Sequence, residues 1–201
     1  MTELIHFHAH NPKKYLLFDF DETLFYLHLP WDTFRKELKS KLRVLDKQIE
    51  MRLDYKNTSG TAPMNKAVRM YGQKAKKIVT DWSGAFERDY LKKVNKNSEL
   101  IEFIKKHRSK YAHFIWSSNM HATVTRLLTQ EGLHDYFVKL LTQDVVSLIK
   151  PYPDAFYMIF DPKRHIHNQF LMIGNSDKDE HAAKACGIEF FRVDTEQVSW
   201  D

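Results

Sequence analysis

The sequence has little cysteine and no long apolar run, and both shortages exclude classes of protein. Only one cysteine, Cys186, occurs among 201 residues, so no disulfide can form within the chain, and a reducing compartment suits such a protein. No run approaches the roughly 20 apolar residues that span a bilayer. The polar start MTELIHFHAH also lacks the apolar centre of a signal peptide. We therefore expect a soluble cytoplasmic protein with no membrane partner.

The positive charge of the chain is concentrated in one segment. The whole chain has a net charge of +5, whereas residues 31–97 hold 17 lysines and arginines against 8 aspartates and glutamates, a net charge of +9. In this segment Phe34, Leu38 and Leu42 recur at a spacing of four residues, which predicts an amphipathic helix. The basic residues therefore indicate either a solvated helix face or a surface that steers an anionic substrate.

Two different patterns follow one another along the chain. Residues 26–96 are predicted to be helical throughout, with helices at 31–53, 63–82 and 83–94. From residue 97 onward, short apolar stretches alternate with helical patterns, which predicts parallel β-α-β units. Strands are predicted within 111–119, 137–142, 170–176 and 189–194, and helices within 97–110, 121–133, 153–160 and 178–188. The expected fold is α/β, with a Rossmann-like parallel sheet flanked by helices (residues 1–25 and 97–201) and a small all-helical domain (residues 26–96).

Polar residues follow three of the predicted strands. Asp19 and Asp21 interrupt the apolar stretch YLLFDFDETLF, Ser117-Ser118-Asn119 follow a second strand, and Gly174-Asn175-Ser176 follow a third. In open α/β sheets, ligands bind outside the carboxyl ends of the strands, so one pocket is expected to collect these residues. Two carboxylates two residues apart in extended backbone point the same way, and they suit a reaction that needs a nucleophile and a proton carrier. The alternative is that both aspartates only cap a helix or turn.

Four short motifs, taken together, resemble those of the haloacid dehalogenase superfamily of phosphohydrolases. DFDET matches the pattern Asp-x-Asp-x-Thr, a serine follows the second strand, and KPYPDAF contains a lysine before a proline. The segment GNSDKDEHAAKACGI matches the fourth motif, an acidic turn followed by Ala-Ala and Ala-Gly-Ile. The four motifs occur in the family's order and span residues 15–193.

The resemblance implies a role for each matched residue. Asp19 would be the nucleophile that forms an aspartyl phosphate, Asp21 the general acid and base, and Lys150 the cation that offsets negative charge. Phosphate contacts would come from Thr23, Ser117, Ser118, Asn119 and Lys150. The second-motif residue is either Ser117 or Ser118, and we favour Ser117 because the following helical run suits it better.

The resemblance also implies a Mg²⁺ cofactor. Its ligands would be Asp19, Asp21, Asn175 and Asp179. Asn175 departs from the family pattern, which usually has an acidic residue at this position, and an amide oxygen attracts a hard cation less than a carboxylate does. Asp177 lies nearby as a substitute. The alternating histidines His6, His8 and His10 have no accompanying carboxylate or cysteine, so a metal site there is not expected.

The resemblance implies a magnesium-dependent phosphatase that hydrolyses a small phosphate monoester, such as a sugar phosphate or nucleotide. The helical insertion would be a cap that excludes water and contacts the leaving group. A phosphomutase of the same family is one alternative, and a nucleic-acid-binding or protein-binding pseudophosphatase, with Asn175 as the sign of lost catalysis, is another. The basic residues interleave with apolar ones and form no recognition motif, which argues against a nucleic-acid partner. Substrate identity and oligomeric state are left open.

Overall fold

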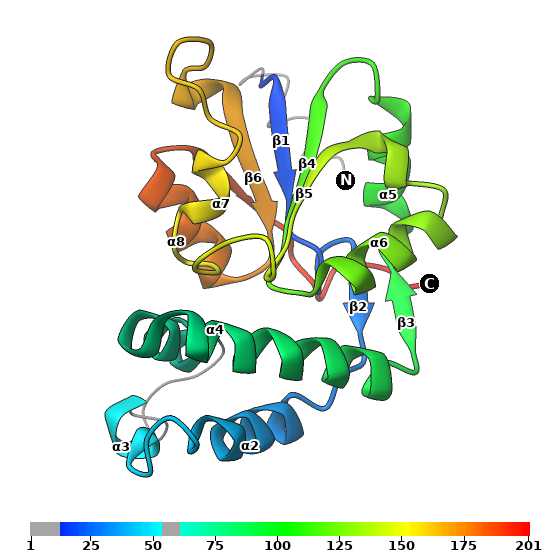
Figure 1. Ribbon diagram of the computed structural model, residues 1–201. Coiled ribbons are helices and arrows are strands. Elements are labelled where there is room, and N and C mark those ends of the chain that lie inside the picture. The colour runs from blue at the N-terminus through cyan, green and yellow to red at the C-terminus, as the bar shows by residue number, and fades with distance from the viewer. Residues whose placement is uncertain (1–12, 54–60) are drawn as a thin grey trace. The chain divides into compact units, whose positions relative to one another are not determined.

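The computed structural model describes residues 13–53 and 61–201 (Figure 1). The chain divides into two compact units, one formed by Met1–Leu27 with Lys93–Asp201 and the other by His28–Lys92. His6, His8 and His10 lie outside the described residues. None of the helices in the described part of the chain combines the length and the hydropathy that a membrane crossing requires.

The larger unit is built on a five-stranded sheet in the order β5-β4-β1-β6-β7. All four strand pairs are parallel. The strands are β1 (Tyr15–Phe18), β4 (Ala112–Trp116), β5 (Phe137–Leu141), β6 (Phe170–Gly174) and β7 (Glu189–Arg192). β1 lies at the centre, and its residues Leu16, Leu17 and Phe18 are fully buried, as expected for a strand covered on both faces. The predicted Rossmann-like α/β core is confirmed.

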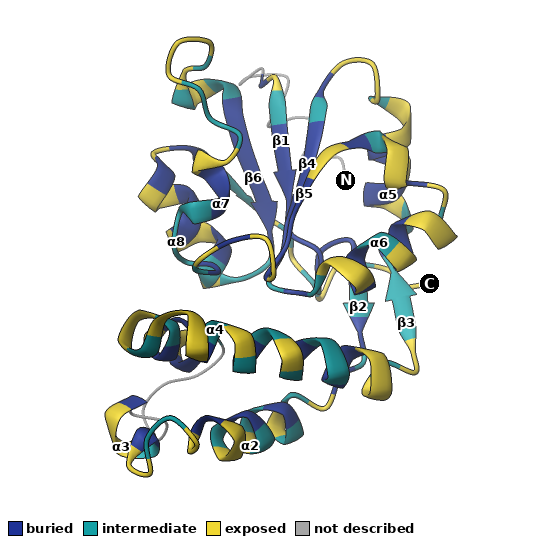
Figure 2. Cartoon of the chain, in the orientation of Figure 1, coloured by how far each residue is buried: buried dark blue, intermediate teal, exposed yellow. Residues whose placement is uncertain are grey.

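Helices connect the strands and cover the sheet (Figure 1). They are α5 (Ser98–Lys106), α6 (His121–Gln130), α7 (Asp154–Tyr157), α8 (Asp177–Cys186) and the 3₁₀ turns His134–Tyr136 and His167–Gln169. Figure 2 shows buried strands beside helices that are exposed on one side, the arrangement that amphipathic periodicity predicts. The helix predicted over 153–160 is shorter than expected: α7 begins at Asp154 and ends at Tyr157.

A second, two-stranded sheet belongs to the same unit. β2 (Phe25–Leu27) pairs antiparallel with β3 (Val94–Lys96). The prediction that residues 26–96 are helical throughout is therefore wrong at both ends. Phe25 and Leu27 are buried while Tyr26 between them is half-buried, so this stretch has the period of a strand, but three residues are too few to show it in the sequence.

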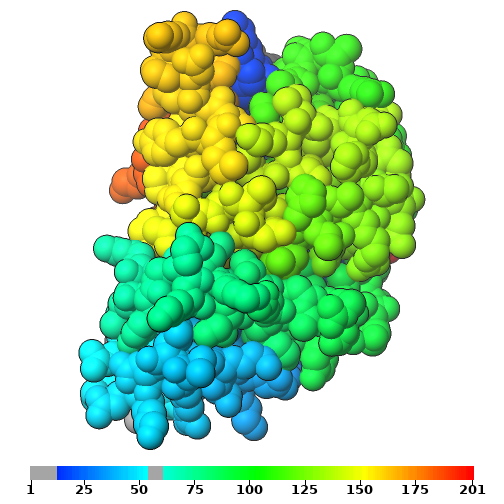
Figure 3. Space-filling view, viewed as in Figure 1, coloured from blue at the N-terminus to red at the C-terminus, as the bar shows by residue number. Residues whose placement is uncertain are grey.

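In its described residues, 28–53 and 61–92, the smaller unit contains three helices. They are α2 (Trp31–Leu42), α3 (Ile49–Leu53) and α4 (Ala62–Tyr90). The predicted helix over 31–53 is thus split in two, and the two helices predicted over 63–94 are one, interrupted at Gly72 (φ 60°, ψ −139°) rather than before Ser83. Trp31, Phe34 and Phe86 pack with ring centroids 5.1–6.1 Å apart. Figure 3 shows the side chains of these helices in space-filling form, coloured from blue to green along the chain.

Candidate active site

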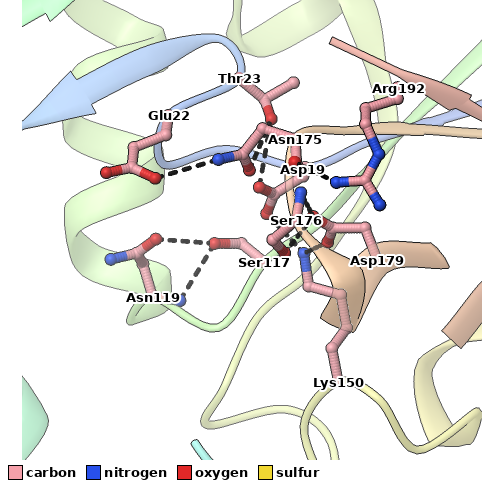
Figure 4. A network of polar contacts seen from close by, with 10 residues as sticks. All are labelled: Asp19, Glu22, Thr23, Ser117, Asn119, Lys150, Asn175, Ser176, Asp179 and Arg192. Atoms are coloured by element: carbon pink, nitrogen blue, oxygen red, sulfur yellow. Dashed lines mark hydrogen bonds and ion pairs between the residues drawn. The ribbon is translucent and has the colours of Figure 1, made fainter. Parts of the chain in front are cut away.

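Asp19 follows the central strand directly and is almost completely buried. Its backbone N–H donates to the carbonyl of Ile173 on β6 at 2.8 Å, so the sheet pairing continues up to this residue. Its side chain lies beside Lys150, whose Nζ donates to Asp19 Oδ1 and to Asp179 Oδ1, both at 2.5 Å (Figure 4). Lys150 is 3% exposed and Asp179 is fully buried. Residues from three distant parts of the sequence therefore meet in one ion-pair group.

Burial and charge shift the ionisation of all three groups. Burial raises the pKa of Asp19 to about 6, the charge of Asp179 acts in the same direction, and Lys150 partly offsets both. Burial disfavours the charged form of Asp179 as well, but Lys150 and the hydrogen bonds from Ser176 outweigh it and lower the pKa of that carboxyl. Burial also disfavours the charged form of Lys150, yet the two carboxylates raise its pKa. Lys150 therefore stays positively charged between its partners.

Thr23 lies between Asp19 and Asn175. Its fully buried hydroxyl is 3.2 Å from Asp19 Oδ2 and 3.4 Å from Asn175 Oδ1. The backbone carbonyl of Thr23 accepts a hydrogen bond from the Asn97 side chain at 3.1 Å, which fixes the turn from inside. The Thr23 hydroxyl thereby links the turn after β1 to the turn after β6, which the parallel pairing of these strands places side by side.

Asp21 lies in the turn that follows Asp19. β1 ends at Phe18, and the Phe20 carbonyl accepts the N–H groups of Leu24 and Phe25 at 3.0 Å, so the chain turns after Asp21. The Asp21 carboxylate accepts the backbone N–H of Leu27 at 2.9 Å. The turn, rather than a continuing strand, therefore determines where this half-buried carboxylate lies.

The residues that follow β4 form a compact polar turn. The Ser117 hydroxyl donates to Asn119 Oδ1 at 2.9 Å and accepts the Asn119 backbone N–H at 3.0 Å. Both residues are buried, whereas Ser118 is half-buried. Phe18 lies opposite both Ile115 and Ile173 in the sheet, so Ser117 and Asn175 each stand two residues beyond a partner of Phe18. The register places these polar turns at the same edge as Asp19.

The turn between β6 and α8 holds Asp179 tightly. Asp179 Oδ2 accepts the Ser176 backbone N–H at 3.0 Å and the Ser176 hydroxyl at 2.6 Å. A Cβ atom at Gly174 would lie 2.7 Å from Asp179 Cγ, closer than real contacts allow, so the carboxylate needs glycine at this position. The absence of a side chain at Gly174 therefore leaves room for the Asp179 carboxylate beside Lys150.

Two charged residues at this site were missed by the sequence reasoning. Arg192, at the end of β7, donates to the Asn175 carbonyl at 2.8 Å, to Asp177 at 2.9 Å and to Glu180 at 2.5 Å. Glu22 accepts a hydrogen bond from the Asn175 side chain at 3.0 Å. No local pattern marks either residue, because both contacts depend on how the strand ends are arranged. Asp177, considered as a substitute metal ligand, pairs with Arg192 and is exposed.

A comparison with known protein families shows which family the chain belongs to. The sequence model of the haloacid dehalogenase-like hydrolases matches residues 16–193, most of the chain. The protein belongs to this family. The match begins in β1 and ends just beyond β7, so it includes Asp19, Lys150 and Asp179. The resemblance read from the four motifs is confirmed.

An individual member of the haloacid dehalogenase-like family matches a shorter part of the chain than the family model does. A phosphoglycolate phosphatase from Photobacterium profundum is 30% identical over 105 residues, which cover 50% of this chain and 46% of that protein. The matched region thus spans about half the length of this curated relative.

Solved structures share the fold at lower identity. A predicted phosphoglycolate phosphatase from Haemophilus somnus 129PT has a TM-score of 0.57 at 18% identity, over 89% of this chain and 84% of that chain. CbbY from Rhodobacter sphaeroides, in complex with phosphate, has a TM-score of 0.56 at 17% identity, over 89% and 84% of the two chains. At these identities the likeness shows the fold of the haloacid dehalogenase-like hydrolases.

The oxygen atoms near Asp19 suit the magnesium ion that this family implies. Within the described residues, no three histidine, cysteine, aspartate or glutamate side chains converge as a preformed metal group. Mg²⁺ does not require one, since it keeps several waters and usually takes one or two carboxylates together with substrate phosphate. The Asp19 carboxylate and the Asn175 amide oxygen, both within 3.4 Å of the Thr23 hydroxyl, provide oxygen donors of this kind. The donor set therefore fits Mg²⁺.

Proposed function

We propose that the protein is a magnesium-dependent phosphatase that hydrolyses a small phosphate monoester through an aspartyl phosphate. The observation that carries this proposal is the buried group of Asp19, Lys150 and Asp179, with Lys150 Nζ at 2.5 Å from each carboxylate. Phosphoryl transfer depends on positioning and on fixed charge that stabilises the transition state. Asp19 at a strand end beside a fixed ammonium meets both requirements.

In the proposed reaction, a carboxylate oxygen of Asp19 attacks the phosphorus atom and the bond to the leaving oxygen breaks. Asp21 gives its proton to that oxygen, so the first product leaves as an alcohol. Water then attacks the phosphorus atom of the aspartyl phosphate, Asp21 takes a proton from this water, and inorganic phosphate and free Asp19 are formed. The Leu27 N–H that donates to Asp21 supports this role, because it fixes one carboxylate oxygen.

The remaining residues of the proposed site bind the phosphoryl group and the metal. Phosphate contacts are assigned to Thr23, Ser117, Ser118, Asn119 and Lys150. Of the expected metal ligands, we assign Asp19 and Asn175; Asp21 is kept for proton transfer, and Asp179 already accepts hydrogen bonds from Lys150 and Ser176 on its two oxygens. When bound, Mg²⁺ would offset the negative charge of the transferred group. Lys150 does the same from the protein side, and its buried position strengthens this effect because the surroundings screen it little.

The substrate class follows from charge and from the relatives. Residues 31–97 have a net charge of +9, which favours an anionic ligand, and a relative named phosphoglycolate phosphatase matches half of the chain. We assign a small anionic phosphorylated metabolite of the cytoplasm as the substrate. The helical unit His28–Lys92, which lies within the expected segment 26–96, is assigned as the cap, and the larger unit as the catalytic core.

A phosphate-release screen tests the proposed function. The protein is incubated with a panel of phosphate monoesters, including sugar phosphates, nucleotides and phosphoglycolate, with Mg²⁺ or with excess chelator. Sustained release that requires Mg²⁺ is the expected result, and Asp19→Asn is the matched inactive control. A burst without sustained release would indicate a phosphomutase instead. Absence of release from every monoester would contradict the proposal.

A further inference from the structure

Glu22 adopts a backbone conformation that side chains rarely take. Its φ angle is +59°, and it is the only residue other than glycine with a positive φ in the described chain. Glycine is the residue that fits such a position without strain. The Glu22 side chain is exposed, so core packing does not explain the presence of glutamate in this turn. The contact that this side chain does make is polar.

That contact is a hydrogen bond to Asn175. Glu22 Oε2 accepts from Asn175 Nδ2 at 3.0 Å (Figure 4). A carboxylate has no proton to donate, so the amide nitrogen rather than the amide oxygen must face Glu22. The amide oxygen then points the other way, where it lies 3.4 Å from the Thr23 hydroxyl. Glu22 thus decides which end of the amide faces Asp19.

The backbone of Asn175 is held separately from its side chain. Arg192 Nη1 donates to the Asn175 carbonyl at 2.8 Å, and the Arg192 guanidinium is itself held by Asp177 and Glu180. With the main chain fixed in this way, the side-chain amide of Asn175 can still rotate. The hydrogen bond to Glu22 prevents this rotation, because it holds the amide nitrogen.

Glu22 also contributes charge. Asn175 is neutral, so its amide oxygen attracts a cation less strongly than a carboxylate oxygen would. The Glu22 carboxylate accepts a hydrogen bond from the nitrogen of this amide. It therefore polarises the amide, and it adds a negative charge near the cation site. Residues that hold a metal ligand from behind are known to tune metal affinity strongly.

We propose that Glu22 is a positioning residue for the magnesium site: it turns the amide oxygen of Asn175 toward Asp19 and supplies the negative charge that Asn175 lacks. This inference rests on the proposed function, because it concerns the same metal site. It predicts that Mg²⁺ affinity depends on Glu22, although this side chain is exposed and is not itself a ligand.

Calorimetric titration of Mg²⁺ into the full-length, metal-free protein measures this dependence without turnover. Glu22→Gly keeps the turn, since glycine accepts a φ of +59°, and removes the carboxylate. We expect the dissociation constant for Mg²⁺ to rise about tenfold while the melting temperature stays the same or increases. Glu22→Gln retains an oxygen that can accept the amide proton but has no charge, so it should give a smaller rise.

Two further variants separate this effect from general loss of charge. Glu102→Gln removes an exposed carboxylate that pairs with Lys105 on α5, and it should leave the Mg²⁺ affinity unchanged. Asn175→Asp should restore the affinity in the Glu22→Gly background, because it places charge directly in the site. In the presence of Glu22 the same substitution should help less, since two carboxylates would then face each other and repel.

The outcomes distinguish this inference from the proposed function. If the wild-type protein binds Mg²⁺ and releases phosphate but Glu22→Gly binds Mg²⁺ equally well, the role of Glu22 is wrong and the phosphatase proposal stands. If the Glu102→Gln control weakens binding as much as Glu22→Gly, the effect is one of net charge and the positioning role is again wrong. A wild-type protein that neither binds Mg²⁺ nor releases phosphate would overturn both.

Discussion

Single residues determine the charge balance of the active site. Asp19 and Asp179 are both buried and share the ammonium group of Lys150, so the three groups carry one net negative charge when all are ionised. Burying charge without a partner is costly, and the raised pKa of Asp19, about 6, reflects this cost. A bound cation would favour the ionised form of Asp19. The proposed Mg²⁺ would therefore also favour the ionised nucleophile.

His113, which lies outside the active site, makes the stability of the fold depend on pH. It is 1% exposed and packs against the rings of Phe18 and Phe137. Burial lowers the pKa of His113 to about 4; the Tyr136 backbone opposes this shift and the charge of His107 adds to it. Unfolded histidine titrates near 6.5, so the unfolded chain binds more protons between these values. The contribution of His113 to stability is therefore complete above pH 6.5 and is lost as the pH falls toward 4.

We expect the free energy of unfolding to fall through His113 by up to about 1.4 kcal/mol per pH unit in that window. Urea unfolding at several pH values measures it. His113→Phe should flatten the dependence relative to the wild type. Parallel wild-type and His113→Phe curves across the window would show that His113 does not titrate as described.

At the scale of elements, the β6–α8 turn is the most constrained part of the site. Gly174→Ala would bring a Cβ atom to 2.7 Å from Asp179 Cγ, and the Asp179 carboxylate is held by Lys150 and Ser176. We expect a loss of about 1–3 kcal/mol in unfolding free energy, the usual cost of overpacking, together with a marked loss of phosphate release because Asp179 is displaced from Lys150.

Gly132→Ala is a suitable comparison for that variant. Gly132 has a φ of +65° and no atom within 4 Å of an added Cβ, so the substitution strains the backbone away from the site. It should cost about 1 kcal/mol of stability with activity retained. Equal activity of the two variants, measured on fully folded protein, would contradict the role assigned to Gly174.

The elements also show how far the sequence could be interpreted. The strands of the larger sheet and most of their helices were predicted because apolar runs and helical periodicity are local signals, and the parallel direction follows from their alternation. β2 and β3 were missed because each has three residues. The aspartate and serine turns could be assigned to one edge of the sheet. Glu22 and Arg192 could not, because their contacts with Asn175 arise from a left-handed turn and from the register of β6 with β7.

At the scale of the whole molecule, the uneven charge of the chain makes a kinetic prediction. If the net charge of +9 on residues 31–97 attracts an anionic substrate, added salt should screen this attraction. Raising the salt concentration from about 0.05 to 0.5 M, at saturating Mg²⁺, should increase KM several-fold while kcat changes little. The Debye length shortens from about 14 to 4 Å over this range. A KM independent of salt would remove the steering role of this segment.

In the proposed reaction, Asp19 carries the phosphoryl group during turnover. The most direct measurement is mass spectrometry of peptides from protein that has been mixed with Mg²⁺ and its best monoester substrate and then quenched in acid. We expect a phosphoryl group on the peptide that contains Asp19, sensitive to hydroxylamine and missing in Asp19→Asn. Steady phosphate release by the wild type with no phosphoryl group on Asp19, or undiminished release by Asp19→Asn, would show that Asp19 is not the nucleophile.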